Sequence, residues 1–407
     1  MKPEPYIPLR VTDLIDVLLT EAGTPQHAPP SQHDAECFRE LAGIVGDRIT
    51  ASHRAIRNLL KDVYAPFDPD TETIHLRAFT DEDRHVKLQR LFGSFTVLLE
   101  RGGFHRMTRA EIEEAIIGAS YWGIEMDVCW EVFDRVEIFV RGEGIGWRTR
   151  RPWWLFFRSE DVQVPTYRRV VLILKQQPHK RLGRDPDTQS VFLKIFKDIP
   201  TMDVEMLLPG TQVRMRRADR GKLGGSALGS LAYIAWKLLT SISIPQLLSG
   251  SLLALASPLF LIIGYGYKTF YSFKVSRRTY MLQLHQSLYY QGLDSNAGVL
   301  FRLFDEAAEQ DIRQTLLAYY FLWRFAPAQG WDAETLDKAV EGDLAQRVGG
   351  AVEVDTCEAL ARLQRLELIK QHGNLYTTLP IHLALIAVRD ASETLADAPS
   401  AWQKTLL

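Results

Sequence analysis

Apolar residues recur at helical spacing in the first third of the chain. Between residues 38 and 60 they stand three or four positions apart, which is typical of an amphipathic helix. These residues are Phe38, Leu41, Ile44, Val45, Ile49, Ile56, Leu59 and Leu60. Thr108 and Glu111 form a capping box that predicts a helix over residues 110–120. We therefore expect residues 1–134 to form a helical bundle domain.

The hydrophobic period changes to two after Phe133, where Val136, Ile138 and Val140 occupy alternate positions. Two further strand-like runs cover residues 169–175 and 191–196 and are bounded by glycine and proline. This pattern is typical of short strands joined by turns. It predicts a small antiparallel β unit within residues 135–222.

An apolar window of 45 residues, 223–267, contains a single charged side chain, Lys237. A membrane-spanning helix needs about 20 residues, so the window accommodates two spans with a break at Pro245. We expect a transmembrane helical hairpin over residues 223–268. Two alternatives are a single span preceded by a surface-lying helix and a buried helical hairpin. The mean hydropathy of -0.11 excludes a protein made mostly of spanning helices.

Basic residues flank this window on both sides, and such residues stay on the cytoplasmic side of a membrane. The expected location is therefore the bacterial inner membrane with both termini cytoplasmic, or a mitochondrial membrane in a eukaryote. The N-terminal sequence lacks the apolar core of a signal peptide.

The last third of the chain again has helical spacing. A helical segment is expected to emerge from the membrane over residues 269–330. Residues 331–407 contain two predicted helices followed by two short strand-like pieces around Gly373, the order found in a winged helix. The predicted fold class is α+β: a helical bundle, an antiparallel β unit, a transmembrane hairpin and a C-terminal helical region with a winged-helix-like end.

Charge is divided sharply along the chain, although the formal net charge is only -2. Residues 1–134 hold 14 basic and 23 acidic groups, and residues 135–222 hold 19 and 10. Residues 223–292 hold five basic groups and no acidic one, and residues 293–407 hold 10 and 17. A basic centre between acidic flanks predicts contact with an anionic surface.

Basic and aromatic residues alternate in the loops of the β unit and before the apolar window. We interpret them as contacts to anionic lipid headgroups, with core packing of the aromatic residues and nucleic-acid binding as alternatives. The lipid-contact residues are Arg148, Arg150, Arg151, Trp153, Trp154, Arg214, Arg216 and Arg217. DNA is disfavoured as a partner of the acidic C-terminal region, which would repel phosphates.

Catalytic motifs are missing, since the chain has no HExxH, P-loop, nucleophile-elbow or kinase pattern. The segment Gly142-Glu-Gly-Ile-Gly146 is interpreted as a β-turn. Three dispersed cysteines predict neither disulfides nor a zinc site, so we expect no cofactor and leave catalytic residues unassigned. Acidic residues gather near residue 300, and local ion pairs four residues apart, Arg302 with Glu306 and Glu309 with Arg313, explain most of this cluster. The alternative is a metal site that would use Asp294, Asn296, Asp305 or Glu309.

One stretch of the chain contains Phe-Lys-Asp-Ile-Pro at 196–200, and a second contains Tyr-Tyr-Gln at 289–291. These two stretches resemble an uncharacterised membrane-protein family that carries a domain of unknown function and includes a mitochondrial transmembrane protein of animals. A looser similarity covers Tyr6 to Leu9 and Arg141 with Gly142. The motif residues are Phe196, Lys197, Asp198, Pro200, Tyr289, Tyr290, Asp294, Asn296 and Glu306. The resemblance implies no catalytic residues.

Two functions follow as hypotheses. The first is a membrane-anchored, cytoplasmic-facing scaffold or regulatory protein whose basic β unit lies on anionic lipid and whose helical parts bind a protein; an oligomer is compatible with it. The alternative is a lipid- or metal-dependent enzyme with a site near residues 289–309. For the motif we expect Tyr289 and Tyr290 to pack against the 196–200 strand and Asn296 to cap the next helix.

Overall fold

A computed structural model describes residues 4–20, 29–72, 79–120, 125–150, 160–214 and 289–390, together with Tyr267, Tyr271 and Val275. The N-terminal part is mainly helical, as predicted. Its elements are α1 (Val11–Thr20), α2 (Gln32–Tyr64), η1 (Ala65–Phe67), α3 (Asp81–Arg101), β1 (His105–Arg106) and α4 (Arg109–Ser120). Helix α2 begins where the Ser31 side chain accepts a hydrogen bond from the Asp34 N–H, and α3 begins at a capping box of Thr80 and Asp83.

The β unit is antiparallel, as predicted, and five strands form one sheet in the order β1-β3-β4-β5-β7. The elements of this part are β2 (Glu125–Asp127), η2 (Trp130–Val132), β3 (Phe133–Arg150), β4 (Glu160–Gln176), η4 (Lys180–Leu182), β5 (Val191–Pro200), η5 (Thr201–Leu207), β6 (Gln212–Arg214) and β7 (Gly292–Ser295). Strands β3 and β4 continue past the last β5 pairing, Thr166 with Pro200, as a two-stranded ribbon.

The glycines at 142, 144 and 146 lie within strand β3, so the predicted β-turn is wrong. A Cβ atom at Gly142 would lie 2.9 Å from the Arg168 side chain, and one at Gly146 would lie 2.6 Å from the Thr166 methyl group. The glycines therefore leave room for side chains of β4 to lie across β3. Glycine inside a strand often marks such a close approach.

The C-terminal part contains α8 (Ala297–Arg324), α9 (Ala333–Val348), α10 (Cys357–Arg365), β8 (Ile369–His372), β9 (Leu375–Thr378) and α11 (Ile381–Asp390). Strands β8 and β9 pair as a tight antiparallel hairpin around Gly373, where the sequence predicts two strand-like pieces. Two helices followed by a hairpin is thus the observed order, and the winged-helix interpretation remains a prediction.

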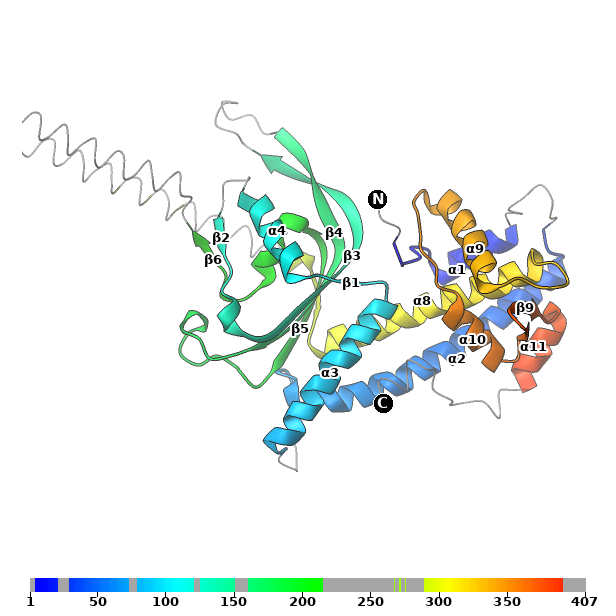
Figure 1. Cartoon of the computed structure of the whole chain (residues 1–407), viewed down its shortest axis with the longest axis horizontal. Coiled ribbons are helices and arrows are strands. Elements are labelled where there is room, and N and C mark those ends of the chain that lie inside the picture. The colour runs from blue at the N-terminus through cyan, green and yellow to red at the C-terminus, as the bar shows by residue number, and fades with distance from the viewer. Residues whose placement is uncertain are drawn as a thin grey trace, which may run out of the picture.

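Helices α2 and α8 run side by side through the molecule, with the sheet at one end and α9, α10 and α11 at the other (Figure 1). One core joins apolar residues of α1 and α2, up to Ile49, with the second half of α8 and the helices that follow it. A second core packs α2, α3 and the first half of α8 against one face of the sheet. A third core lies on the other face, beside α4 and η5.

No helix within the part of the chain that the structure describes is long and apolar enough to cross a membrane. The long helices α2, α3 and α8 all carry charged side chains along their lengths, because each has a polar face. This finding corrects the predictions of a transmembrane hairpin in the fold, of an integral membrane protein and of a bacterial inner-membrane or mitochondrial-membrane location. Of the predicted hairpin, only Tyr267 is among the described residues.

Candidate functional site

The motif strand β5 lies between β4 and β7, so the two stretches that resemble the uncharacterised family are neighbours in the sheet. Phe196 is buried and opposes Gly292 across the pair, and the Gln291 side chain donates to the Asp198 carbonyl at 2.9 Å. Tyr289 and Tyr290 are 80% and 74% exposed, so the prediction that they pack against this strand is wrong. Their rings contact one another edge to face.

Asn296 joins the sheet to the start of α8. Its backbone N–H donates to the Leu193 carbonyl at 2.7 Å, its side-chain oxygen accepts from the Leu193 N–H at 3.2 Å, and its amide donates to Asp70 at 2.6 Å. The residue occupies the N-cap position, as predicted, but its side chain makes no capping bond. Its φ of 49° with a ψ of -122° is a backbone conformation that glycine adopts far more readily than residues with a side chain. Asn296 therefore acts as a structural connector.

The acidic residues near residue 300 do not converge. Each carboxylate pairs with a different arginine: Asp294 with Arg302 at 3.1 Å, Asp305 with Arg57 at 3.8 Å, Glu306 with Arg141 at 2.5 Å, and Glu309 with Arg313. The predicted pair of Glu309 with Arg313 is thus present, whereas the predicted pair of Arg302 with Glu306 is wrong: Arg302 pairs with Asp294, and Glu306 pairs across the fold with Arg141. This arrangement holds the described segments together and does not form a common ligand point for a metal.

Arg141 lies where the resemblance motifs meet. Its guanidinium is buried, donates to the Gly102 carbonyl at 2.7 Å and pairs with Glu306. The Tyr6 ring lies 4.0 Å from the guanidinium carbon, and the Phe104 ring lies 4.3 Å from it. A desolvated cation between aromatic rings is a strong contact. The N-terminal Tyr6, strand β3 and helix α8 are therefore joined at one buried guanidinium.

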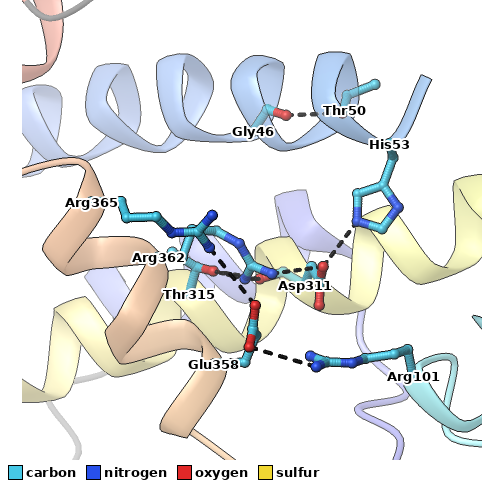
Figure 2. A network of polar contacts seen from close by, with 9 residues as sticks. All are labelled: Gly46, Thr50, His53, Arg101, Asp311, Thr315, Glu358, Arg362 and Arg365. Atoms are coloured by element: carbon cyan, nitrogen blue, oxygen red, sulfur yellow. Dashed lines mark hydrogen bonds and ion pairs between the residues drawn. The ribbon is translucent and has the colours of Figure 1, made fainter. Parts of the chain in front are cut away.

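A second polar cluster is buried among α2, α8 and α10 (Figure 2). The Asp311 carboxylate lies 2.9 Å from the His53 Nε2 atom and accepts from Arg362 at 2.7 Å. Arg362 also donates to the Thr315 hydroxyl at 2.8 Å. Burial alone would raise the pKa of Asp311, but Arg362 and His53 outweigh it and hold the pKa below its usual range. The carboxylate is thus kept charged inside the protein.

This cluster could not be found from the sequence, because His53, Asp311 and Arg362 are far apart along the chain and belong to no motif. Glu358 extends it toward the surface, lying 3.5 Å from Arg101 and 3.7 Å from Arg365. Asp311 and His53 are both almost fully buried, which excludes solvent from the pair. The geometry indicates a structural role that fixes α10 on α8.

We expect Arg362→Met to lower the free energy of unfolding by about 3–5 kcal/mol, because it leaves a buried carboxylate without its cation. Urea unfolding followed by circular dichroism measures this change. Arg365→Met is the matched control: its guanidinium is partly exposed, so we expect a loss below about 1 kcal/mol. Equal losses in the two variants would contradict the assigned role of Arg362.

Glu205 is the other buried carboxylate that stands out, and it lies in η5 with no exposed surface. Neither of its carboxylate oxygens has a hydrogen-bond partner of good geometry among the described residues. Burial and, less strongly, the charge of Asp203 raise the pKa of Glu205 to about 8, and the residue's own backbone N–H offsets this only in part. The side chain is therefore protonated at neutral pH.

Glu205 predicts a dependence of stability on pH. A glutamate ionises in the unfolded chain near pH 4.5 but in the folded protein near pH 8, so the folded state binds the extra proton between these values. Stability should therefore fall as pH rises from 5 to 8, by at most about 1.4 kcal/mol per pH unit from this group. Glu205→Gln should flatten that fall in urea unfolding, whereas the exposed Glu72→Gln should not.

The predicted lipid-contact side chains lie outside the described part of the structure, although the backbones of Arg148, Arg150 and Arg214 belong to strands. Ahead of them on β3, Ile145 and Trp147 are 64% and 70% exposed.

Cys129, Glu131 and His179 lie close enough together to hold a metal ion. This group could not be found from the sequence, because the cysteine and the histidine stand in no recognisable spacing.

A family model described as a protein of unknown function (DUF3754) matches residues 167–298. The chain therefore carries a DUF3754 domain, which extends from strand β4 to the start of helix α8. This supports the predicted relationship to an uncharacterised family. The membrane nature of that family and its animal mitochondrial member remain predictions. No solved structure matches the chain.

Proposed function

We propose that this protein is a non-enzymatic scaffold or regulatory protein whose β unit rests on anionic lipid headgroups. The observation that carries the proposal is the exposed face of the β3–β4 ribbon. Ile145 and Trp147 stand at alternate positions of β3, so both side chains point to the same face of the ribbon. The proposal involves no membrane-spanning segment.

The chemistry of this face fits a lipid surface. A tryptophan has an apolar ring and a polar N–H, which suits the boundary between headgroups and acyl chains. The chain continues from Trp147 through Arg148, Arg150 and Arg151, and residues 135–222 hold nine more basic than acidic groups. Each basic residue near an anionic surface contributes about 1 kcal/mol. The acidic helical parts are then left to contact a protein partner.

The enzyme alternative finds less support. It was motivated by carboxylates near residues 289–309, and these lie in separate ion pairs with four different arginines. A carboxylate neutralised by its own arginine is a poor starting point for a shared ligand or acid-base site. We therefore favour a binding role over catalysis at this segment.

Cosedimentation of the full chain with vesicles tests the lipid contact. We expect binding to phosphatidylglycerol vesicles that falls steeply between about 0.05 M and 0.5 M salt, because salt screens the attraction. Replacing Ile145 and Trp147 together by serine should weaken binding at least about tenfold, since complete burial of one such side chain is worth ~1.5–3 kcal/mol and about 1.4 kcal/mol corresponds to a factor of ten. Ile386→Ser is the matched control, because Ile386 is similarly exposed on α11.

Two results would overturn the lipid proposal. One is equal binding of the chain to neutral phosphatidylcholine vesicles, and the other is unchanged binding of the double serine variant. A preference for nucleic acid over the anionic vesicles would identify a different partner for the basic β unit.

A further inference from the structure

We propose that Cys129, Glu131 and His179 form a binding site for a divalent cation of the zinc type. The Cys129 Sγ atom lies 3.9 Å from the His179 Nε2 atom, and the nearer Glu131 carboxylate oxygen also lies 3.9 Å from Nε2. One ligand atom from each of the three residues lies within 4.8 Å of the others. Thiolate, imidazole and carboxylate are the ligands that zinc takes in proteins.

The fold holds the two loops of this group together. Cys129 precedes η2, which leads into the start of β3, and His179 follows the end of β4. Because β3 and β4 are antiparallel, both residues lie at the same end of the pair. Gln177 joins the loops: its backbone N–H donates to the Val132 carbonyl at 2.9 Å, and its side chain donates to the Glu131 carbonyl at 2.6 Å. The proximity of the three ligands is thus a product of the strand pairing.

The distances are close to those of an occupied site. Tetrahedral zinc, with bonds of about 2.3 Å to sulfur and about 2.0 Å to nitrogen and oxygen, places sulfur and nitrogen roughly 3.5 Å apart and nitrogen and oxygen roughly 3.3 Å apart. Both separations from Nε2 are 3.9 Å, so each must shorten by about half an ångström. The Cys129 sulfur and the Glu131 oxygen, which lie within 4.8 Å of each other, must also approach to roughly 3.5 Å. The Glu131 side chain is 85% exposed and free to rotate inward.

The arrangement differs from that of a catalytic triad. In a triad the imidazole uses one nitrogen for the nucleophile and the other for the carboxylate. Here Cys129 and Glu131 both approach Nε2, while Nδ1 accepts the Arg181 backbone N–H at 3.2 Å. Three ligand atoms around one point fit a cation. Three protein ligands would also leave one coordination position open to solvent or another ligand.

Metal binding at this site should release a proton and move the ring proton of His179, and both changes can be measured. With Nδ1 accepting a hydrogen bond, the neutral ring carries its proton on Nε2, where the metal must bind. On binding, the ring proton moves to Nδ1 and the Cys129 thiol releases its proton to solvent. Nδ1–H and the Arg181 N–H then face each other as two donors, so that hydrogen bond must open. Binding should therefore release a proton and shift the Arg181 amide resonance.

Zinc titration into the full chain, followed by calorimetry at pH 7.5, tests the site. We expect Cys129→Ser and His179→Gln each to weaken binding at least tenfold, and Glu131→Gln to weaken it less. Cobalt provides a second readout, since thiolate coordination adds a near-ultraviolet charge-transfer band that Cys129→Ser should abolish. Because the Glu131 side chain is exposed, Glu131→Gln keeps the test valid if another variant fails to fold.

The matched control is His33→Gln. Cys37 and His33 also have Sγ and Nε2 atoms 3.9 Å apart, but they do not belong to a group of three metal-ligating residues among those described. His33→Gln and Cys357→Ser should bind zinc like the wild type. Unchanged zinc affinity in both Cys129→Ser and His179→Gln, or a cobalt band that persists in Cys129→Ser, would overturn the proposal. Vesicle binding is measured separately, so failure of one proposal does not affect the other.

Discussion

Helix α8 is buried along most of its 28 residues, and ion pairs offset the free-energy cost of burying its charged side chains. Its first half contributes to the core beneath the sheet, and its second half to the core of the C-terminal helices. Asp311 lies between these halves and is neutralised by Arg362 from α10, with His53 of α2 alongside. A buried carboxylate without such partners would cost several kcal/mol.

The start of α8 is fixed by a different kind of contact. Asn296 exchanges backbone and side-chain hydrogen bonds with Leu193 of β5, and it reaches Asp70 beyond η1. Arg141 then joins β3 to Glu306, about three turns further along α8, and places its guanidinium against Tyr6. Asn296 thus connects the DUF3754 region to Asp70 outside it, whereas the Arg141–Glu306 pair joins two segments that both lie outside the matched residues. These residues are polar, yet their observed role is structural.

Two surfaces lie outside these structural contacts. One is the face of the β3–β4 ribbon, and the other is formed by the two loops at the opposite end of the β3–β4 pair. The ribbon offers Ile145 and Trp147 to solvent beyond the last pairing with β5. The loops bring a thiol, an imidazole and a carboxylate to one point. Both features depend on the long β3–β4 pair. At one end the pair extends beyond the sheet and forms the ribbon face, and at the other end the Gln177 side chain hydrogen-bonds the two loops together.

Local sequence alone determined the secondary structure of much of the chain. The 3.6-residue period of α2 and the two-residue period of β3 reflect burial of one face, and a capping box such as Thr108 with Glu111 satisfies backbone groups within a few residues. The β-turn predicted for the glycine segment 142–146 is wrong, because these glycines make room for side chains of β4 and do not form a local turn. The transmembrane interpretation was based on an apolar window whose residues, Tyr267 apart, lie outside the described part of the structure.

Pairings between distant residues were decided only by the tertiary structure. Glu306 has Arg302 four residues away, yet it pairs with Arg141, because the helix face that carries it packs toward the middle of β3. Cys129 and His179 have no spacing that identifies a site, and strand pairing brings them within 3.9 Å. Asp311 resembles any acidic residue of a polar helix until α10 covers it with Arg362. Sequence periodicity reports which face of an element is buried, but the partner of a buried charge depends on which element covers that face.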